Sequence, residues 1–72
     1  MTTAEKIKEV RQAKGFSQSK FAKRTKVFNQ SQISKIEKGD RRITDVDLIV
    51  IAKTLSVSVS ELFGESIPKR AN

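Results

Sequence analysis

Residues 17–39 read SQSKFAKRTKVFNQSQISKIEKG, and this stretch predicts two short helices joined by a tight turn. Ser17 is a candidate N-cap for the first helix, because its hydroxyl can accept a hydrogen bond from a free backbone N–H group there. Asn29, with Gln32 three residues later, resembles a capping box that opens the second helix. Gly39 ends that helix, since glycine readily takes the left-handed conformation found after helices. Two helices connected in this way have the geometry of a helix-turn-helix.

Similar capping signals and apolar residues at helical spacing extend this pattern over most of the chain. Full capping boxes begin at Thr2 and Ser58, and a weaker one begins at Thr44, with Asp in place of Glu. Residues 1–64 form the predicted domain, and residues 65–72 form a short, flexible C-terminal tail. We predict an all-α fold, a compact five-helix bundle with helices at about residues 3–14, 18–25, 30–38, 45–55 and 59–64.

The composition favours a polyanionic partner and excludes several kinds of chemistry. The 72 residues include 15 Lys and Arg against 8 Asp and Glu, which gives a net charge of +7. Nucleic acids and anionic membrane surfaces are the partners that such a charge favours. The chain has no Cys and no His, so we expect no disulfide, no metal site and no cofactor.

The sequence argues against a membrane protein. The longest apolar run, residues 48–52, has five residues, whereas a transmembrane helix needs about twenty. The N-terminus lacks the basic start and apolar stretch of a signal peptide. The basic helical faces lack a large apolar face free of the core, which argues against binding to a membrane surface. We therefore expect a cytoplasmic protein.

Positive charge is concentrated in the first part of the chain. Residues 1–42 carry 12 basic and 4 acidic side chains, whereas residues 43–72 carry 3 and 4. We therefore expect the first part to meet a polyanion and the near-neutral remainder to hold a surface for a partner chain.

The second helix of the pair presents a polar face without an acidic side chain. At about 100° per residue, Ile36 and Glu37 point to the same side as Ile33, toward the core. Gln32 flanks the other side, and Gln30 can reach forward past the helix end. The outward side carries Ser31, Ser34, Lys35 and Lys38. Gln can pair with adenine, Lys with guanine and Ser with bases or phosphates, so this face suits the major groove of DNA. An ordinary solvated helix is the alternative interpretation.

Six motifs spread over about residues 5–64 extend the interpretation. They are IKEVRQAKGFSQ at 7–18, FA at 21–22, QSQISKIEKG at 30–39, RIT at 42–44, IAKTLSVS at 51–58 and ELF at 61–63. Together they resemble the Xre/Cro/cI family of helix-turn-helix regulators, which includes the short lambdoid phage repressors. The resemblance implies a lambda repressor-like domain that binds double-stranded DNA sequence-specifically, as a homodimer on a palindromic operator. It also implies a bacterial, phage or plasmid origin, and we expect no small-molecule ligand.

The resemblance assigns roles to individual residues. The second helix of the pair, about Gln30–Lys38, becomes the recognition helix, with base contacts from Gln30, Ser31 and Lys35. Arg11 and Glu37 match a structural salt bridge of the family. Asn29 and Gln32 are expected to contact phosphates or peripheral bases. The full set of expected DNA backbone contacts is Gln18, Asn29, Gln32, Lys26, Lys38, Arg41 and Arg42.

The turn between the two helices departs from the family pattern. Ala22 and Ile33 are eleven positions apart, where ten is usual, and Lys26 occupies a site where glycine is common. If the turn needs a left-handed residue, Asn29 is the candidate. Phe28 has two interpretations: it packs into the core, or it lies exposed and touches a thymine methyl group.

The C-terminal apolar residues suggest how two chains could associate. We expect the homodimer interface to include Val57, Val59, Leu62, Phe63 and Ile67. The alternative function is a protein-interaction or antitoxin-type module built on the same helices. Ser31 and Lys35 have the spacing of a Ser–Lys dyad, but nothing in the sequence indicates an oxyanion site, so we do not expect an enzyme.

Overall fold

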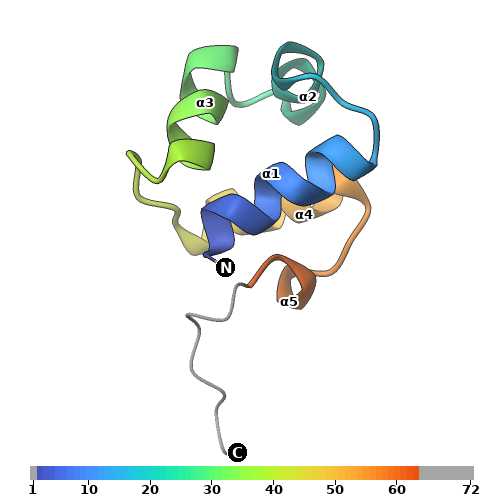
Figure 1. The fold of residues 1–72 in the computed structure, drawn as a ribbon, viewed down its shortest axis with the longest axis vertical. Helices are drawn as coiled ribbons and strands as arrows, with labels where there is room; N and C mark the ends of the chain where they lie inside the picture. The colour runs from blue at the N-terminus through green and yellow to red at the C-terminus, as the bar shows by residue number, and fades with distance from the viewer. Residues whose placement is uncertain (1, 64–72) are drawn as a thin grey trace, which may run out of the picture.

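The computed structural model describes residues 2–63, which form an all-helical bundle (Figure 1). The helices are α1 (Thr3–Ala13), α2 (Gln18–Thr25), α3 (Gln30–Lys38), α4 (Asp45–Leu55) and α5 (Val59–Leu62). The all-α fold and the five helices are confirmed, and no strand occurs within the described residues. The last helix was predicted to reach residue 64, but it ends at Leu62, and the backbone of Phe63 is extended. The predicted tail at 65–72 lies outside the described residues.

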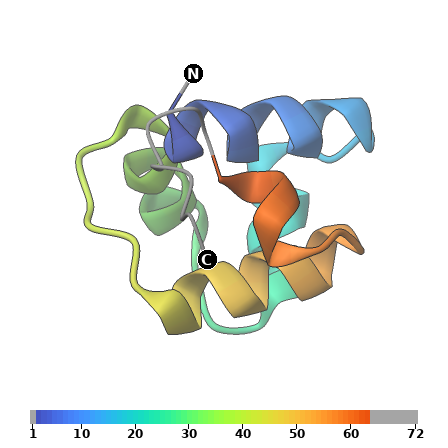
Figure 2. The ribbon, with the colours of Figure 1, turned by 90° about the horizontal axis from the view of Figure 1, so that it is seen from below.

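The helix-turn-helix formed by α2 and α3 lies at one end of the bundle. Figure 1 shows α2 and α3 above α1 and α4, and Figure 2 shows α5 between α1 and α4. α3 packs on both α1 and α2, while α4 packs on α2 and α5. α3 is therefore held from two sides, and this arrangement fixes its direction relative to the rest of the molecule.

The core is formed by the apolar stripe of each helix. The side chains with essentially no exposure to solvent are Ile7, Phe21, Ile33, Ile36, Ile51, Leu55 and Leu62. They come from all five helices and join in one cluster, because each amphipathic helix must cover its apolar stripe against its neighbours. None of the helices in the described part of the chain is long and apolar enough to cross a membrane.

Every helix begins at the capping residue that the sequence predicts. Asn29 Oδ1 accepts a hydrogen bond from the Gln32 backbone N–H at 2.8 Å, and Gln32 Oε1 accepts from the Asn29 N–H at 2.9 Å. Reciprocal pairs of this kind also open α1, α4 and α5, and Ser17 caps α2. In the first box the Thr2 backbone N–H donates to the Glu5 carboxylate, which lowers the pKa of Glu5. The capping residues thus set the beginnings of the helices locally.

The left-handed residue of the α2–α3 turn is Lys26, not Asn29. Lys26 has φ 64°, whereas Asn29 has φ −100° and serves as the N-cap. The expectation for Asn29 was therefore wrong, because a capping residue needs extended backbone angles. Phe28 is half-buried and packs against the core, which decides between its two interpretations in favour of packing.

Lys26→Gly should stabilise the protein by roughly 1 kcal/mol, because a side chain costs energy in the left-handed region and glycine has no such cost. Lys26→Ala, which removes the charge but keeps Cβ, should give no such gain. Urea unfolding of the three proteins compares them. Equal midpoints for the Gly and Ala variants would show that the turn stores no strain at this position.

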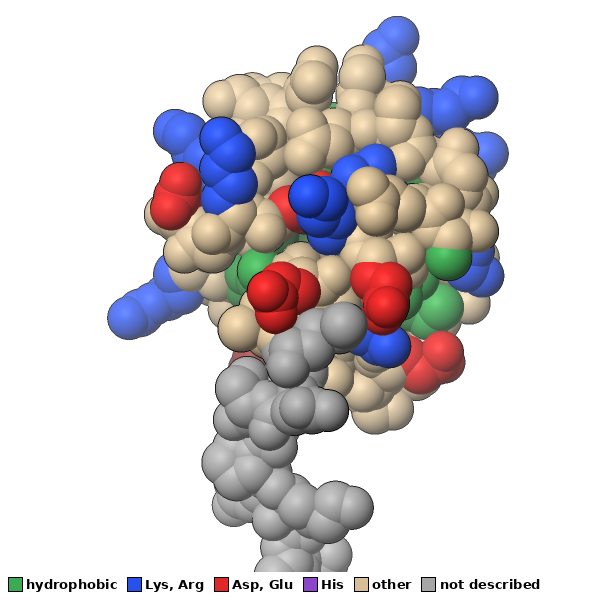
Figure 3. Space-filling view, in the orientation of Figure 1, with side chains coloured by type: hydrophobic (Ala, Val, Ile, Leu, Met, Phe, Trp, Pro, Cys, Tyr) green, Lys and Arg blue, Asp and Glu red, His purple; other side chains and the backbone are tan. Residues whose placement is uncertain are grey.

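The surface of the bundle is uneven in charge. On the face shown in Figure 3, Lys and Arg side chains project from the upper edge, where α2 lies. Several Asp and Glu side chains gather in the lower half of the same face. Lys and Arg side chains also project from the left and right sides of this face, so the positive charge of the chain is spread over several of its edges.

Candidate nucleic-acid interface

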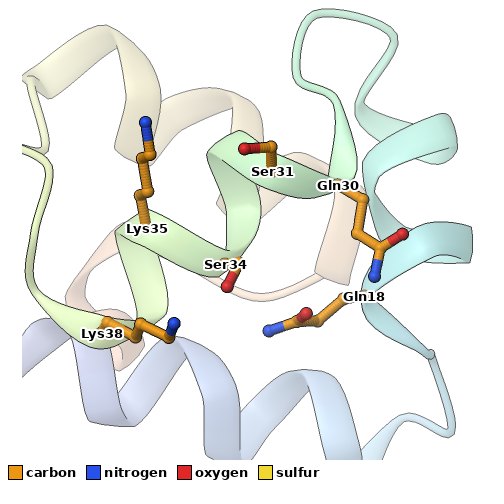
Figure 4. A pocket seen from close by; sticks show the side chains of 6 residues that line it. All are labelled: Gln18, Gln30, Ser31, Ser34, Lys35 and Lys38. Carbon is orange, nitrogen blue, oxygen red and sulfur yellow. The ribbon is translucent and has the colours of Figure 1, made fainter.

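A polar hollow of about 410 Å³ lies between the beginning of α2 and the outward face of α3 (Figure 4). Its lining residues are Gln18, Gln30, Ser31, Ser34, Lys35 and Lys38. The structure thus brings together the three predicted base contacts, Gln30, Ser31 and Lys35, and two of the predicted backbone contacts. Ser34 was missing from the predicted contacts, although helical spacing had placed it on this face.

The chemistry of the hollow favours a partner rich in hydrogen-bond acceptors. Its lining has two cations, two amides and two hydroxyls, and no acidic side chain. Lys35 and Lys38 are exposed to solvent. The N-terminus of α2 adds its free backbone N–H groups and the positive end of the helix dipole beside Gln18. A phosphodiester backbone or the acceptor edge of a base could satisfy these donors.

Gln18 connects the hollow to a buried ion pair. Its Nε2 donates to Glu37 Oε1 at 3.1 Å, which leaves a second amide N–H for another acceptor. Glu37 in turn accepts from Arg11, with Nε to Oε2 at 2.6 Å and Nη2 to Oε1 at 3.1 Å. Arg11 also donates to the backbone oxygen of Phe16 at 2.6 Å.

The Arg11–Glu37 pair is largely withdrawn from solvent. The two side chains are 7% and 2% exposed. Their bidentate geometry satisfies both charges in the interior, as burial requires. Because the pair joins α1 to the end of α3, and Gln18 joins it to α2, it fixes three helices around the hollow.

The other predicted backbone contacts differ in how free they are. The side chains of Asn29 and Gln32 form the hydrogen bonds of the capping box of α3. Lys26 and Arg42 are exposed, and no hydrogen bond or ion pair holds either side chain within the described residues. Arg41 is engaged: its guanidinium lies 5.2 Å from the centre of the Phe28 ring, and its Nη2 lies 3.7 Å from Asp47 Oδ2.

The structure corrects one part of the predicted dimer interface. Leu62 is completely buried in the core of its own chain, so its side chain is closed to a second copy. Val57 and Val59 are half-buried against the same core, while Phe63 is 41% exposed. Ile67 lies outside the described residues. Sequence reasoning missed two further exposed apolar side chains, both on α4: Val46 and Ile49.

A helix-turn-helix whose second helix offers an acid-free polar face is characteristic of DNA-binding proteins. The model of the family described as "Helix-turn-helix" matches residues 7–62, and the chain belongs to this family, in its Xre/Cro/cI-type branch. The fold and family are those of DNA-binding transcription regulators.

Comparison with solved structures supports the same assignment. The restriction-modification controller protein C.AhdI from Aeromonas hydrophila is similar in fold, with a TM-score of 0.80 and 30% sequence identity. The match covers 85% of this chain and 87% of that chain. A search of curated proteins gave no match.

Proposed function

We propose that the protein binds double-stranded DNA sequence-specifically, with α3 in the major groove and as a dimer on a palindromic operator. The observation that carries the proposal is the hollow along α3, which gathers donors on one side and excludes acidic groups. The amide, hydroxyl and ammonium groups of these side chains can donate hydrogen bonds to base edges and phosphates.

The lining residues divide between reading bases and holding the backbone. Gln30 can pair with adenine N6 and N7, and Lys35 can donate to guanine O6 and N7. Ser31 is short, so α3 can approach the bases closely at this point. The proposed phosphate contacts are Gln18, Lys26, Lys38 and Arg42, with Asn29 and Gln32 at the edge.

The proposed dimer would use the end of the bundle away from α3. Phe63 is the exposed apolar residue of the predicted interface in the described part of the chain. A two-fold dimer should place its recognition helices about 34 Å apart, which is one turn of DNA. The two half-sites should then repeat, inverted, with their centres about 10 base pairs apart.

Selection of bound sequences from random DNA tests both parts of the proposal. An inverted repeat with this spacing is expected, together with affinity that falls steeply as salt increases. Equal affinity for the selected sites and for random DNA would contradict sequence-specific binding. Single half-sites without a fixed spacing would contradict the dimer alone.

Lys35→Ala should relax base preference more than it weakens binding as a whole. The loss of one base contact should reduce the discrimination between operator and random DNA by about 1–3 kcal/mol. Lys53→Ala is the matched control, since it removes the same charge from an exposed position on α4. Titrations of both DNAs measure the ratio. If Lys35→Ala has the same ratio of operator affinity to random-DNA affinity as Lys53→Ala, Lys35 makes no base contact.

Arg42→Gln and Arg41→Gln should have different effects, the first on the salt dependence of DNA binding and the second on stability. We expect Arg42→Gln to lower the slope of log affinity against log salt by about 0.9, the contribution of one phosphate contact. Arg41→Gln should leave that slope nearly unchanged but lower the free energy of unfolding, because Arg41 holds Phe28 and Asp47. Salt titrations and urea unfolding measure the two effects. The opposite assignment would follow if Arg41→Gln alone changed the slope.

A further inference from the structure

The turn before the recognition helix presents one apolar side chain to solvent. Val27 is 60% exposed, while its neighbour Phe28 packs against the core. Val27 is one of four large apolar residues that are exposed in the described part of the chain. The other three lie on α4 or just after α5. Val27 is therefore the one of the four that belongs to residues 1–42, the part of the chain with the excess of positive charge.

The position of Val27 places it beside the proposed DNA surface. It precedes Gln30, which lines the hollow, by three residues. Three residues of chain span at most about 11 Å, and the major groove is about 12 Å wide. When a helix-turn-helix docks, the N-terminal end of its second helix contacts the bases. A side chain at this distance before α3 can therefore reach the rim of the groove.

The turn holds Val27 in one place. The Thr25 hydroxyl donates to the Ala22 backbone oxygen at 2.6 Å. The same Oγ1 accepts from the backbone N–H of Val27 at 3.4 Å and of Phe28 at 3.1 Å. Lys26 adopts the strained left-handed conformation immediately before Val27. Lys26 is the left-handed C-cap of α2, and these bonds fix the backbone from which the exposed Val27 side chain projects.

A branched aliphatic side chain at the rim of the groove has one specific partner among the bases. Valine offers no hydrogen bond to a phosphate or to a base edge. The 5-methyl group of thymine is the apolar feature of the major groove, and burying it against a side chain distinguishes thymine from the other bases. One interpretation of the sequence placed Phe28 at the surface, in contact with a thymine methyl group. In the structure Phe28 packs against the core, and the exposed apolar residue of this turn is Val27.

We propose that Val27 reads the methyl group of one thymine in each half-site, at the edge next to the N-terminus of α3. This inference rests on the proposed sequence-specific binding and adds a determinant that lies outside the recognition helix. The contact supplies specificity by packing, whereas Gln30 and Lys35 would supply it by hydrogen bonds.

Deoxyuridine provides the probe, because it lacks only the methyl group of thymidine. In the selected operator each thymine is replaced by deoxyuridine in turn, and the affinity of the full-length protein is measured. For one thymine per half-site we expect a loss of about fourfold, which corresponds to one buried methyl group. Val27→Ser should be insensitive to that replacement, with its unfolding midpoint unchanged because the side chain is exposed.

Val46→Ser is the matched control, since Val46 is 68% exposed on α4, away from α3. It should keep the wild-type pattern of sensitivity to deoxyuridine. The proposal is overturned if Val27→Ser keeps that pattern too, or if no thymine is sensitive in the wild type, while sequence-specific binding stands in both cases. If no operator is selected from random DNA, this inference and the proposed function are both overturned.

Discussion

Arg11→Met alone should leave much of the protein unfolded at room temperature. The change leaves the carboxylate of Glu37 in the interior without its cation, with only the amide of Gln18 as a side-chain donor. Removing one partner of a buried pair costs about 3–5 kcal/mol. A domain of this size that has no cysteine to form a disulfide is stable by only about 3–5 kcal/mol. Urea unfolding followed by far-ultraviolet circular dichroism measures the loss.

The double variant Arg11→Met, Glu37→Met is the control for this prediction. It removes both charges, so no ion remains uncompensated, and it should be more stable than either single variant. It still loses the hydrogen bond to the Phe16 backbone oxygen, and therefore should not regain the full stability of the wild type. Single effects that simply add in the double variant would show that the pair does not act as a unit.

The ion pair matters for function because of the helices that it joins. Arg11 lies on α1, Glu37 lies near the end of α3, and Gln18 begins α2. Two apolar residues of similar volume could replace the pair and leave no unpaired charge. They would not make the directional hydrogen bonds that fix how α1, α2 and α3 lie relative to one another. We therefore interpret the pair as orienting α3 beside the hollow rather than as a main source of stability.

The helix boundaries were predictable from sequence because their signals are local. Ser17 and Asn29 each act on N–H groups three residues away, so no distant contact is needed to place the beginnings of α2 and α3. The outward face of α3 was equally predictable, since helical periodicity alone separates Ile33 and Ile36 from the lining of the hollow. These features required only the spacing of residues along the chain.

The features that escaped prediction depend on residues far apart in sequence. Arg41 is engaged because Phe28, thirteen positions earlier, lies under its guanidinium. Leu62 is buried because α5 packs on both α1 and α4, which the short apolar pattern near the C-terminus could not indicate. The left-handed angle at Lys26 is the exception, because it is local: the glycine that is common at this site was the signal for it, although lysine itself disfavours the conformation.

Ile33→Ala should destabilise the protein by about 2–5 kcal/mol, because it opens a cavity where α3 is packed on the core. Ile33 has no exposed surface and lies on the inward side of α3, opposite the hollow. Ile33→Val removes one methyl group from the same site and should cost only about 0.5–1.5 kcal/mol. Urea unfolding of the three proteins gives the comparison.

The same pair of variants distinguishes stability from recognition. Because Ile33 is buried on the side of α3 opposite the hollow that we propose to meet DNA, Ile33→Ala should lower affinity for operator and for random DNA by one common factor, set by the loss of folded protein. A stabilising osmolyte that refolds the variant should then restore both affinities together, since it favours the compact state without touching the interface. If the refolded variant still bound random DNA normally but had lost its preference for the operator, Ile33 would set the tilt of α3 in the groove as well as its stability.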